Sequence, residues 1–364
     1  MDFLQGCLLC LLLTIFHFLA RKASKTPSKL PPGPAQLPII GNLHNLGDQP
    51  HKSLADLAKI HGPLMSLKLG QVTTIVASSP AVAKEILQKH DQVLCNRQVL
   101  LAIQARDHHQ FGMPWLPVES RWRNLRKVCN SYIFTTQKLD SNQELRRRKI
   151  EELMVFVVPV AYQVLFVAGT DTTSSTLEWA MAELLRNPYV LVKAKEELEQ
   201  IIGKGNPLQE SDIHKLPYLQ SIIKETFRLH PPVPLLLPRK AGAEVAICGF
   251  AVPKGAQILV NAWAIGRDPS TWDAPNSFVP ERFMESSVDV KGNNFELIPF
   301  GGGRRICPGL PLALRMLHMM LGSLVHWFDW KLADEIVPEK LDMEEKFGLT
   351  LQKAKPLLAI PTPR

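Results

Sequence analysis

The stretch that decides the fold is FGGGRRICPG, residues 300–309, which places Cys307 on a glycine-rich loop directly before a predicted helix, Leu310 to Trp327. Amide donors of such a loop and the positive end of the following helix lower the pKa of a thiol and hydrogen-bond its sulfur, as a metal-bound thiolate requires. Cys307 is therefore a candidate metal ligand. Two other interpretations remain open for the loop by itself: a buried structural cysteine and a Gly/Arg loop that holds phosphate.

The same loop resembles the haem-binding signature of cytochromes P450. Five residues stand at the positions that define the family's motif: Phe300, Gly303, Arg305, Cys307 and Gly309. The resemblance implies that these residues bind haem b (iron protoporphyrin IX), that Cys307 is the metal ligand and that Arg305 pairs with a haem propionate. It also implies that thiolate donation from Cys307 favours cleavage of the O–O bond of dioxygen.

A second segment, KETFRLHPP at residues 224–232, places Glu225 and Arg228 about one helical turn apart, where the two side chains can pair. Such pairs are common on solvated helices. The segment also resembles the Glu-x-x-Arg helix of cytochromes P450, and PERF at residues 280–283 resembles its partner loop. The resemblance implies a buried structural network of Glu225, Arg228 and Arg282 behind the haem. Breaking a buried ion pair costs about 3 to 5 kcal/mol.

The longest predicted helix, Gln163 to Arg186, contains the small and hydroxylated residues AGTDTT at 168–173, which have low helix propensity. An exposed polar face is one explanation, but apolar residues on both sides favour a buried helix. The segment resembles the acid and alcohol pair of cytochromes P450, at Asp171 and Thr172. The resemblance implies a catalytic role for both: the helix opens locally to leave a groove for dioxygen, Thr172 organises proton delivery and Asp171 relays protons.

Further basic residues are candidates for the haem propionates. Trp122 and Arg126 lie four residues apart on one face of a predicted helix, which amphipathic packing explains equally well. The resemblance implies that both reach the propionates and that Arg239 is a weaker candidate. A basic surface for an acidic flavoprotein reductase is also expected, with solvated charge as the alternative. Its candidate members are Arg121, Arg123, Lys127, Arg304 and Arg315.

The pattern along the rest of the chain predicts a mainly α-helical protein with a small β portion. Short strands are expected at residues 65–69, 73–77, 245–247, 250–252 and 257–261. Helices are expected at residues 80–90, 163–186, 193–202, 218–230 and 310–327. The resemblance covers the chain almost from end to end and implies a cytochrome P450 fold in a truncated form.

Residues 1–20 are the predicted membrane anchor. Phe3 to Ala20 is apolar apart from three residues, which is near the lower length limit for a helix that spans a bilayer. Asp2 precedes this run and four basic residues follow it, which argues against a secretory signal peptide and holds the following chain in the cytoplasm. A buried amphipathic helix is the alternative.

Residues 21–34 are basic and rich in proline, so they cannot continue the anchor helix and form a linker. Together with the resemblance, this predicts a single-pass anchor in the endoplasmic reticulum membrane. The haem-thiolate catalytic domain, residues 35–364, is then expected on the cytosolic side.

The overall composition is that of a globular protein, with 46% hydrophobic and 21% charged residues. The formal net charge of +8 is modest, and no stretch interleaves many basic residues with aromatic ones, so no nucleic-acid partner is expected. Six scattered cysteines indicate a reduced compartment without structural disulfides.

The middle of the chain is shorter than the resemblance predicts. Only 46 residues separate Trp122 from Gly169, where cytochromes P450 have a long run of helices, two of which roof the substrate pocket. Residues 144–154 resemble the start of the missing region, and the residues from Gln163 onward resemble the long helix. The catalytic domain is therefore predicted to be shortened internally around residues 150–163.

Two functions follow from these features. The first is a monooxygenase that hydroxylates a small lipophilic substrate, with electrons from NADPH-cytochrome P450 reductase. Residues 165–188 and 115–130 most resemble plant terpenoid hydroxylases of the geraniol hydroxylase type, which implies a terpenoid substrate. The second is a catalytically impaired haem-binding membrane protein, because the substrate roof is missing. Candidate substrate contacts lie in three predominantly apolar segments, residues 99–117, 235–237 and 347–350.

Overall fold

The computed structural model describes residues 30–99, 104, 108–153, 165–348 and 350–364, and the account below concerns these residues. The predicted anchor, residues 1–20, and most of the predicted linker lie outside them, as does most of the region around residues 150–163. Among the residues that are described, no helix is long and apolar enough to cross a membrane.

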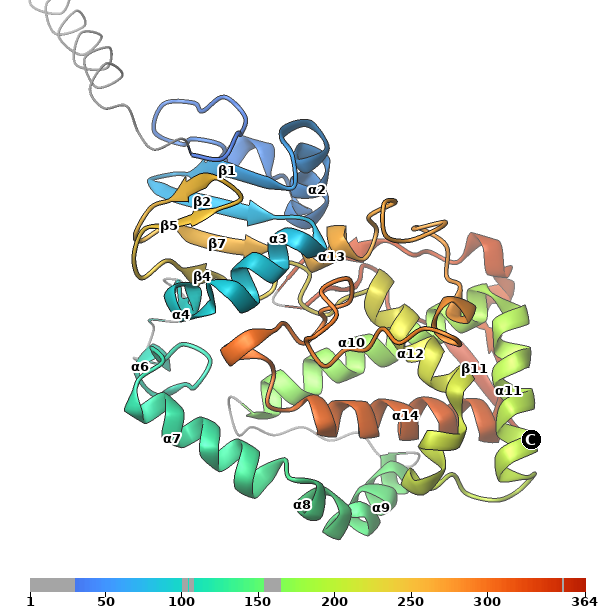
Figure 1. Cartoon of the computed structure of the whole chain (residues 1–364). Coiled ribbons are helices and arrows are strands. Elements are labelled where there is room, and N and C mark those ends of the chain that lie inside the picture. The colour runs from blue at the N-terminus through green and yellow to red at the C-terminus, as the bar shows by residue number, and fades with distance from the viewer. Residues whose placement is uncertain (1–29, 100–103, 105–107, 154–164, 349) are drawn as a thin grey trace, which may run out of the picture.

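The described chain is mainly helical (Figure 1). The α-helices are α2 (Pro50–His61), α3 (Pro80–Lys84), α4 (Asp91–Leu94), α6 (His108–Phe111), α7 (Ser120–Val128), α8 (Thr136–Ser141), α9 (Gln143–Leu153), α10 (Leu165–Arg186), α11 (Pro188–Ile202), α12 (Pro217–Leu229), α13 (Ala262–Ile265) and α14 (Leu310–Trp327). Short 3₁₀ or π-helical turns are η1 (Leu43–Asn45), η2 (Glu85–Lys89), η4 (Cys129–Ile133), η5 (Glu210–Lys215), η6 (Pro280–Phe283), η7 (Gly303–Arg305), η8 (Ala333–Glu335) and η9 (Pro338–Lys340).

The strands are short. They are β1 (Leu64–Leu69), β2 (Val72–Ala77), β3 (Asn96–Arg97), β4 (Arg239–Lys240), β5 (Val245–Ile247), β6 (Phe250–Val252), β7 (Gln257–Val260), β8 (Phe328–Leu332), β9 (Glu345–Lys346), β10 (Gln352–Lys353) and β11 (Ala359–Pro363). The strand predictions for the first and last thirds of the chain are confirmed. The helix predicted over residues 80–90 is also present, but it changes from α3 to the π-helical η2 halfway along.

A five-stranded sheet in the order β1-β2-β7-β4-β3 forms one end of the molecule (Figure 1). β1 and β2 are an antiparallel hairpin, and β7 runs parallel to β2. At the other side of β7, the antiparallel register of β3 and β4 places Arg97 opposite Arg239. Since directly opposite side chains in an antiparallel pair lie close together, the sheet brings two guanidinium groups from distant parts of the chain into one place.

The larger hydrophobic core lies where α10, α11, α12 and α14 pack together (Figure 1). Its fully or almost fully buried leucines come from all four helices: Leu184, Leu198, Leu219 and Leu321. α12 is buried along most of its length. Its amino terminus is capped from α11, because Glu197 accepts hydrogen bonds from the amides of Tyr218 (2.7 Å) and Leu219 (2.9 Å).

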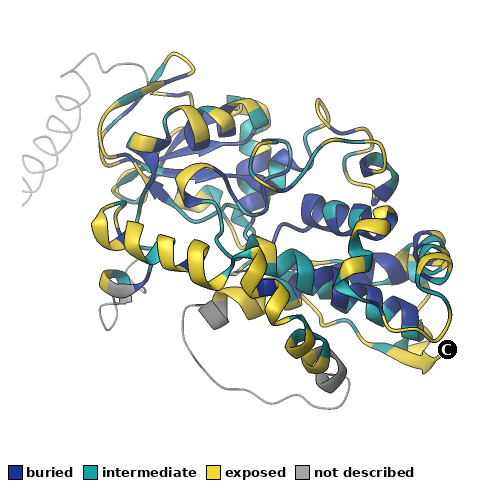
Figure 2. Cartoon of the chain, turned by 60° about the horizontal axis from the view of Figure 1, so that its bottom comes forward, coloured by how far each residue is buried: buried dark blue, intermediate teal, exposed yellow. Residues whose placement is uncertain are grey.

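The segment from α7 to α9 is the most exposed part of the helical region (Figure 2). α7 buries Trp122, but Val128 is 44% exposed and Tyr132, in the turn that follows, is 64% exposed. Large apolar side chains in solvent indicate a surface that lacks packing partners.

Ion pairs attach this exposed segment to the core. Glu210 of η5 binds Arg146 of α9 in a two-pronged contact, with N–O distances of 2.7 and 2.9 Å. Arg315 of α14 lies 2.9 Å from Glu210 and 2.6 Å from Asp140 of α8. The carboxylate of Glu210 is largely buried, and it is the group that joins both arginines.

We therefore expect Glu210→Gln to release α8 and α9 from the core. Removing one partner of a buried ion pair costs up to about 3 to 5 kcal/mol. Arg146 loses its carboxylate partner here, and Arg315 keeps only Asp140. Amide hydrogen exchange of residues 136–153 should accelerate, with smaller changes elsewhere. Glu144→Gln is the control, because Glu144 pairs with Arg147 on the exposed surface. Unchanged exchange in α8 and α9 would contradict this role.

Candidate active site

The loop that carries Cys307 lies between η7 and the start of α14. Its shape is stabilised by a hydrogen bond from the amide of Cys307 to the carbonyl of Phe300, 3.0 Å long. Burial raises the pKa of the Cys307 thiol, while hydrogen bonds from the amides of Gly309 and Leu310 and the charge of Arg126 act in the opposite direction. A metal ion bound to the sulfur overcomes this effect of burial on the pKa, because it deprotonates a coordinating thiol outright. The sulfur is thus prepared for a cation.

Gly303 is required by the protein's own packing. Its φ is +65°, in the left-handed region, and a β-carbon there would lie 2.0 Å from the carbonyl oxygen of Leu87. The ligand loop therefore lies directly against the backbone of η2. At Gly309, by contrast, a β-carbon would be at an ordinary contact distance of 3.7 Å from the sulfur of Cys307.

Two arginines hold the loop from the side of α7. Arg305 donates hydrogen bonds to the carbonyls of Cys95 (2.9 Å) and Leu116, and its guanidinium lies 4.8 Å from the ring centre of Trp122. Burial lowers the pKa of Arg305 to about 10. Arg126 donates to the carbonyl of Ile306, next to the ligand cysteine. The structure thus brings the predicted residues Trp122, Arg126, Arg305 and Cys307 together.

Arg239, the weaker of the predicted propionate candidates, contacts the ligand loop and the residue that supports it. Its two terminal nitrogens lie 2.9 Å from the carboxylate of Asp91 and 3.1 Å from the carbonyl of Gly302. The side chain is buried, and both contacts point to the ligand loop and its support. In this structure Arg239 therefore fastens the loop.

Arg97 is a site residue that the sequence reasoning missed. One terminal nitrogen donates to the carbonyl of Leu237 at 2.6 Å, whereas its Nε is buried without a hydrogen-bond partner among the described residues. Burial, followed by the charges of Arg239 and Arg305, lowers the pKa of Arg97 well below its usual range. The only signal in the sequence was an isolated arginine after a short helix, and its neighbours come from β4, about 140 residues away.

These residues fit haem. A buried donor without a partner and a group of neighbouring guanidiniums are costly in a dry interior unless an anion reaches them. The two propionates of haem are such anions, and Cys307 supplies the sulfur for its iron. Among the described residues, the Nε of Arg97 is the buried donor that such an anion would satisfy, and Arg305 lies close enough to lower the pKa of Arg97.

The predicted acid and alcohol pair lies on α10, which packs against α14. The predicted local opening of this helix is wrong: α10 is continuous from Leu165 to Arg186, and the Thr172 hydroxyl donates to the carbonyl of Ala168 at 2.7 Å. A hydroxyl that bonds to its own helix satisfies itself without breaking the helix. Asp171 accepts a hydrogen bond from Thr350 at 3.2 Å, which ties it to the segment after β9.

The network of Glu225, Arg228 and Arg282 is present in the structure. Arg228 meets Glu225 with two N–O distances of 2.7 Å, and both side chains are completely buried. Arg282 of η6 lies 3.1 Å from Glu225. Arg228 also donates to the carbonyls of Gly266, Pro275 and Ser277. One arginine therefore joins α12 to the loops that follow α13.

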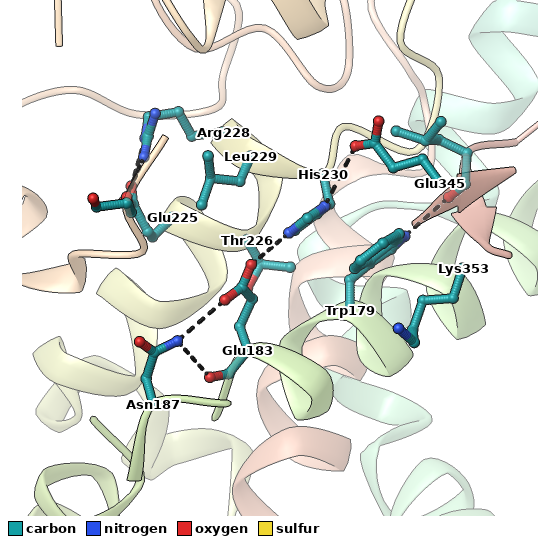
Figure 3. Close-up of polar contacts among 12 residues, drawn as sticks. Trp179, Glu183, Asn187, Glu225, Thr226, Arg228, Leu229, His230, Glu345 and Lys353 are labelled. Carbon is teal, nitrogen blue, oxygen red and sulfur yellow. Dashed lines mark hydrogen bonds and ion pairs between the residues drawn. The ribbon is translucent and has the colours of Figure 1, made fainter. Parts of the chain in front are cut away.

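A second buried network was not anticipated, and Figure 3 shows part of it behind α10. His230 stacks on Trp179 with ring centres 3.9 Å apart, and its Nε2 lies 2.8 Å from Glu183. Its Nδ1 lies 3.8 Å from Glu345, beyond hydrogen-bond range. Glu345 also contacts His51 (3.1 Å) and Lys52, Trp263 and Arg267. The carboxylate of Glu345, on β9, thus lies close to side chains from α2, from α13 and the residues after it, and from the end of α12.

A cysteine with amide donors at a helix start, surrounded by arginines, defines a haem-thiolate protein. The sequence profile of the cytochrome P450 family matches residues 31–156 and 157–359, so the chain belongs to the cytochrome P450 family. Members of this family bind haem through a cysteine thiolate, and the protein is an oxidoreductase that incorporates oxygen.

Three curated relatives are similar over nearly their whole length. The chain is 43% identical to geraniol 8-hydroxylase of Catharanthus roseus, with all of both chains covered, and 43% identical to geraniol 8-hydroxylase of Swertia mussotii, with 95% of each covered. It is 38% identical to drimenol monooxygenase of Persicaria hydropiper, with 100% of this chain and 97% of the relative covered. The first alignment runs over 491 positions, although this chain has 364 residues.

Cys307→Ser is expected to abolish thiolate ligation, because a neutral hydroxyl is a far poorer donor to iron than a thiolate. The spectrum of the reduced protein with carbon monoxide measures this directly, and the thiolate-type Soret band should disappear. Cys248→Ser, at an exposed cysteine, should retain the band. A thiolate-type band that survives in Cys307→Ser would rule out this residue as the ligand.

Glu345 gives a pH prediction. Burial alone raises the pKa of this carboxyl, but contacts with His230, His51 and Arg267 hold it well below its usual range. A carboxylate with a lowered folded-state pKa stabilises the protein above its unfolded pKa, near 4.3, and loses that contribution as the pH falls toward the folded-state pKa.

Glu345→Gln should therefore lower the free energy of unfolding at pH 7 by about 3 kcal/mol or more. The difference from the unmodified protein should shrink as the pH falls below about 5. Urea unfolding at a series of pH values measures both effects. Glu339→Gln is the control, since Glu339 is exposed. A difference that stays constant with pH would contradict the assignment.

Proposed function

We propose that this protein is a monooxygenase that hydroxylates a small lipophilic substrate, a terpenoid, with electrons from NADPH-cytochrome P450 reductase. The observation that carries the proposal is the ligand loop at Cys307 inside its group of arginines. The choice of a terpenoid rests on the relatives, which include geraniol 8-hydroxylases and a drimenol monooxygenase.

The chain's own residues would divide the work as follows. Haem bound through Cys307 supplies the activation of dioxygen. Trp122, Arg126 and Arg305 hold the propionate side, together with Arg97. Thr172 and Asp171 supply protons, and for this the Thr172 hydroxyl must turn away from the Ala168 carbonyl.

The segment from Phe347 to Leu351 is a candidate wall of the substrate site. The carbonyl of Leu351 accepts hydrogen bonds from Ser175 (2.7 Å) and Trp179 (3.2 Å), both on α10. Thr350 contacts Asp171 from the same segment. Thr350 and Leu351 therefore lie along the helix that carries the acid and alcohol pair. The apolar sequence of this segment supports a lipophilic substrate.

The reductase surface is proposed on α7. Arg123 and Lys127 are exposed on this helix. Two other predicted members are already engaged: Arg304 lies 3.2 Å from Asp91, and Arg315 pairs with Glu210. Complementary charge favours docking of an acidic flavoprotein at such a surface.

The proposed location is the endoplasmic reticulum membrane, with the catalytic domain on the cytosolic side. Its support is the sequence alone, an apolar run at residues 3–20 followed by basic residues.

A second candidate is a catalytically impaired haem-binding membrane protein. Three observations favour it. The alignment with the Catharanthus roseus enzyme spans far more positions than this chain has residues, and the family match breaks between residues 156 and 157. The start of α10, residues 168–171, is exposed. A site that is open to water holds substrate poorly and leaks reducing equivalents.

If the second candidate is correct, the 364-residue chain takes up haem but yields scarcely any oxygenated terpenoid. The measurement is NADPH consumption and geraniol oxidation with reductase in membranes. The matched protein is a chimera that carries the corresponding middle block of the Catharanthus roseus enzyme between residues 156 and 157. It should hydroxylate geraniol with tighter coupling to NADPH.

The two proteins separate the two proposals. Robust, coupled turnover by the short chain would rule out the impaired form. A haem-loaded chimera that oxidises no terpenoid would count against the proposed substrate class. Cys307→Ser in the chimera provides the background rate.

A further inference from the structure

We propose that Asp91 is a positioning residue for haem: it holds the ligand loop in place and sets the charge balance of the arginines around it. The inference rests on haem binding through Cys307 and is independent of the proposed substrate, reductase and location. No motif in the sequence pointed to this residue.

Asp91 is the first residue of α4 and is 4% exposed. One carboxylate oxygen lies 2.9 Å from a terminal nitrogen of Arg239. The other accepts hydrogen bonds from the backbone amide of Arg304 at 3.0 Å and from its side chain at 3.2 Å. A buried carboxylate therefore binds the loop that leads to Cys307 directly, through a main-chain amide.

Arg239 provides a second connection between Asp91 and the loop. Its other terminal nitrogen donates to the carbonyl of Gly302 at 3.1 Å. The two attachment points, the carbonyl of Gly302 and the amide of Arg304, flank Gly303. A β-carbon at Gly303 would lie 2.9 Å from the carboxyl carbon of Asp91, so the loop is packed against this side chain as well as bonded to it. The loop has no room to slide toward α4.

Asp91 also acts on the charges of the site. Its negative charge raises the pKa values of three buried guanidiniums, those of Arg97, Arg239 and Arg305, against the larger lowering effect of burial. The same charge acts on the iron. A buried negative charge in this region would oppose the reduction of haem held at Cys307, and its loss would make reduction easier.

Contact with the ligand loop, together with an effect on three buried guanidiniums, distinguishes Asp91 from a carboxylate in an ordinary surface ion pair. Outer groups that orient metal ligands typically change metal affinity about 10- to 100-fold when they are removed. Asp91 acts on the haem site through two contacts, one with the ligand loop and one with Arg239. Its removal should therefore affect both the retention of haem and its reduction potential.

The test uses the full chain loaded with haem. Asp91→Asn keeps the size of the side chain and removes its charge. We expect haem transfer to apomyoglobin to be about 10-fold faster or more, and the midpoint potential to move to a more positive value. Asp91→Glu should restore the potential in part, because it restores the charge. Asp56→Asn is the matched control, since Asp56 pairs with Lys59 on the exposed surface, and both measurements should be unchanged.

A folded Asp91→Asn with unchanged haem retention and unchanged potential overturns the proposal. If Asp91→Asn does not fold, the double variant Asp91→Asn/Arg239→Gln decides, because it leaves neither charge buried without its partner. It should fold and lose haem as fast as expected for the single variant. Normal haem retention in the double variant would overturn the role of the pair in holding the loop.

Discussion

The structure depends on one constraint: a loop of glycines must present a cysteine sulfur beside several buried guanidinium groups. Each arginine satisfies part of its hydrogen-bonding capacity by donating to backbone carbonyls, since a buried guanidinium without acceptors costs free energy. Arg305 does so at the carbonyls of Cys95 and Leu116, and Arg126 does so at the carbonyl of Ile306. The same bonds join the ligand loop to the sheet end and to α7. Cys307 is thereby placed by residues that lie far from it in the sequence.

The helical half of the molecule is held by a comparable arrangement of buried ions. Arg228 satisfies its guanidinium with Glu225 and with three carbonyls, so α12 and the loops after α13 form one unit. His230 connects α10 to the end of α12 (Figure 3), and Glu345 connects that position to His51 of α2. α8 and α9 are joined to this core by the ion pairs of Glu210 with Arg146 and of Arg315 with Asp140 and Glu210.

Parts of this arrangement could be predicted from the sequence because they are local. Glu225 and Arg228 are only three residues apart in the sequence. α14 begins and ends at the residues that the sequence pattern predicted. Other parts depend on pairing between distant segments. Arg97 was missed because its importance comes from the register of β3 with β4. The local opening of α10 predicted at Thr172 is not observed, because the Thr172 hydroxyl donates to a carbonyl of the intact helix. Residue types alone do not reveal this.

The sequence by itself determined the class of protein, because the ten residues 300–309 carry the whole motif that resembles the haem-binding signature of cytochromes P450. It also determined the buried Glu-x-x-Arg pair and the apolar character of the chain around the site. Only the tertiary structure decided which arginine fastens the loop and which has a free donor for an anion. Arg239 and Arg97 carry the same side chain, but Asp91 lies beside Arg239, whereas the buried Nε of Arg97 has no hydrogen-bond partner in the described part of the chain. A charge acquires its role from the groups that surround it, and these come from across the chain.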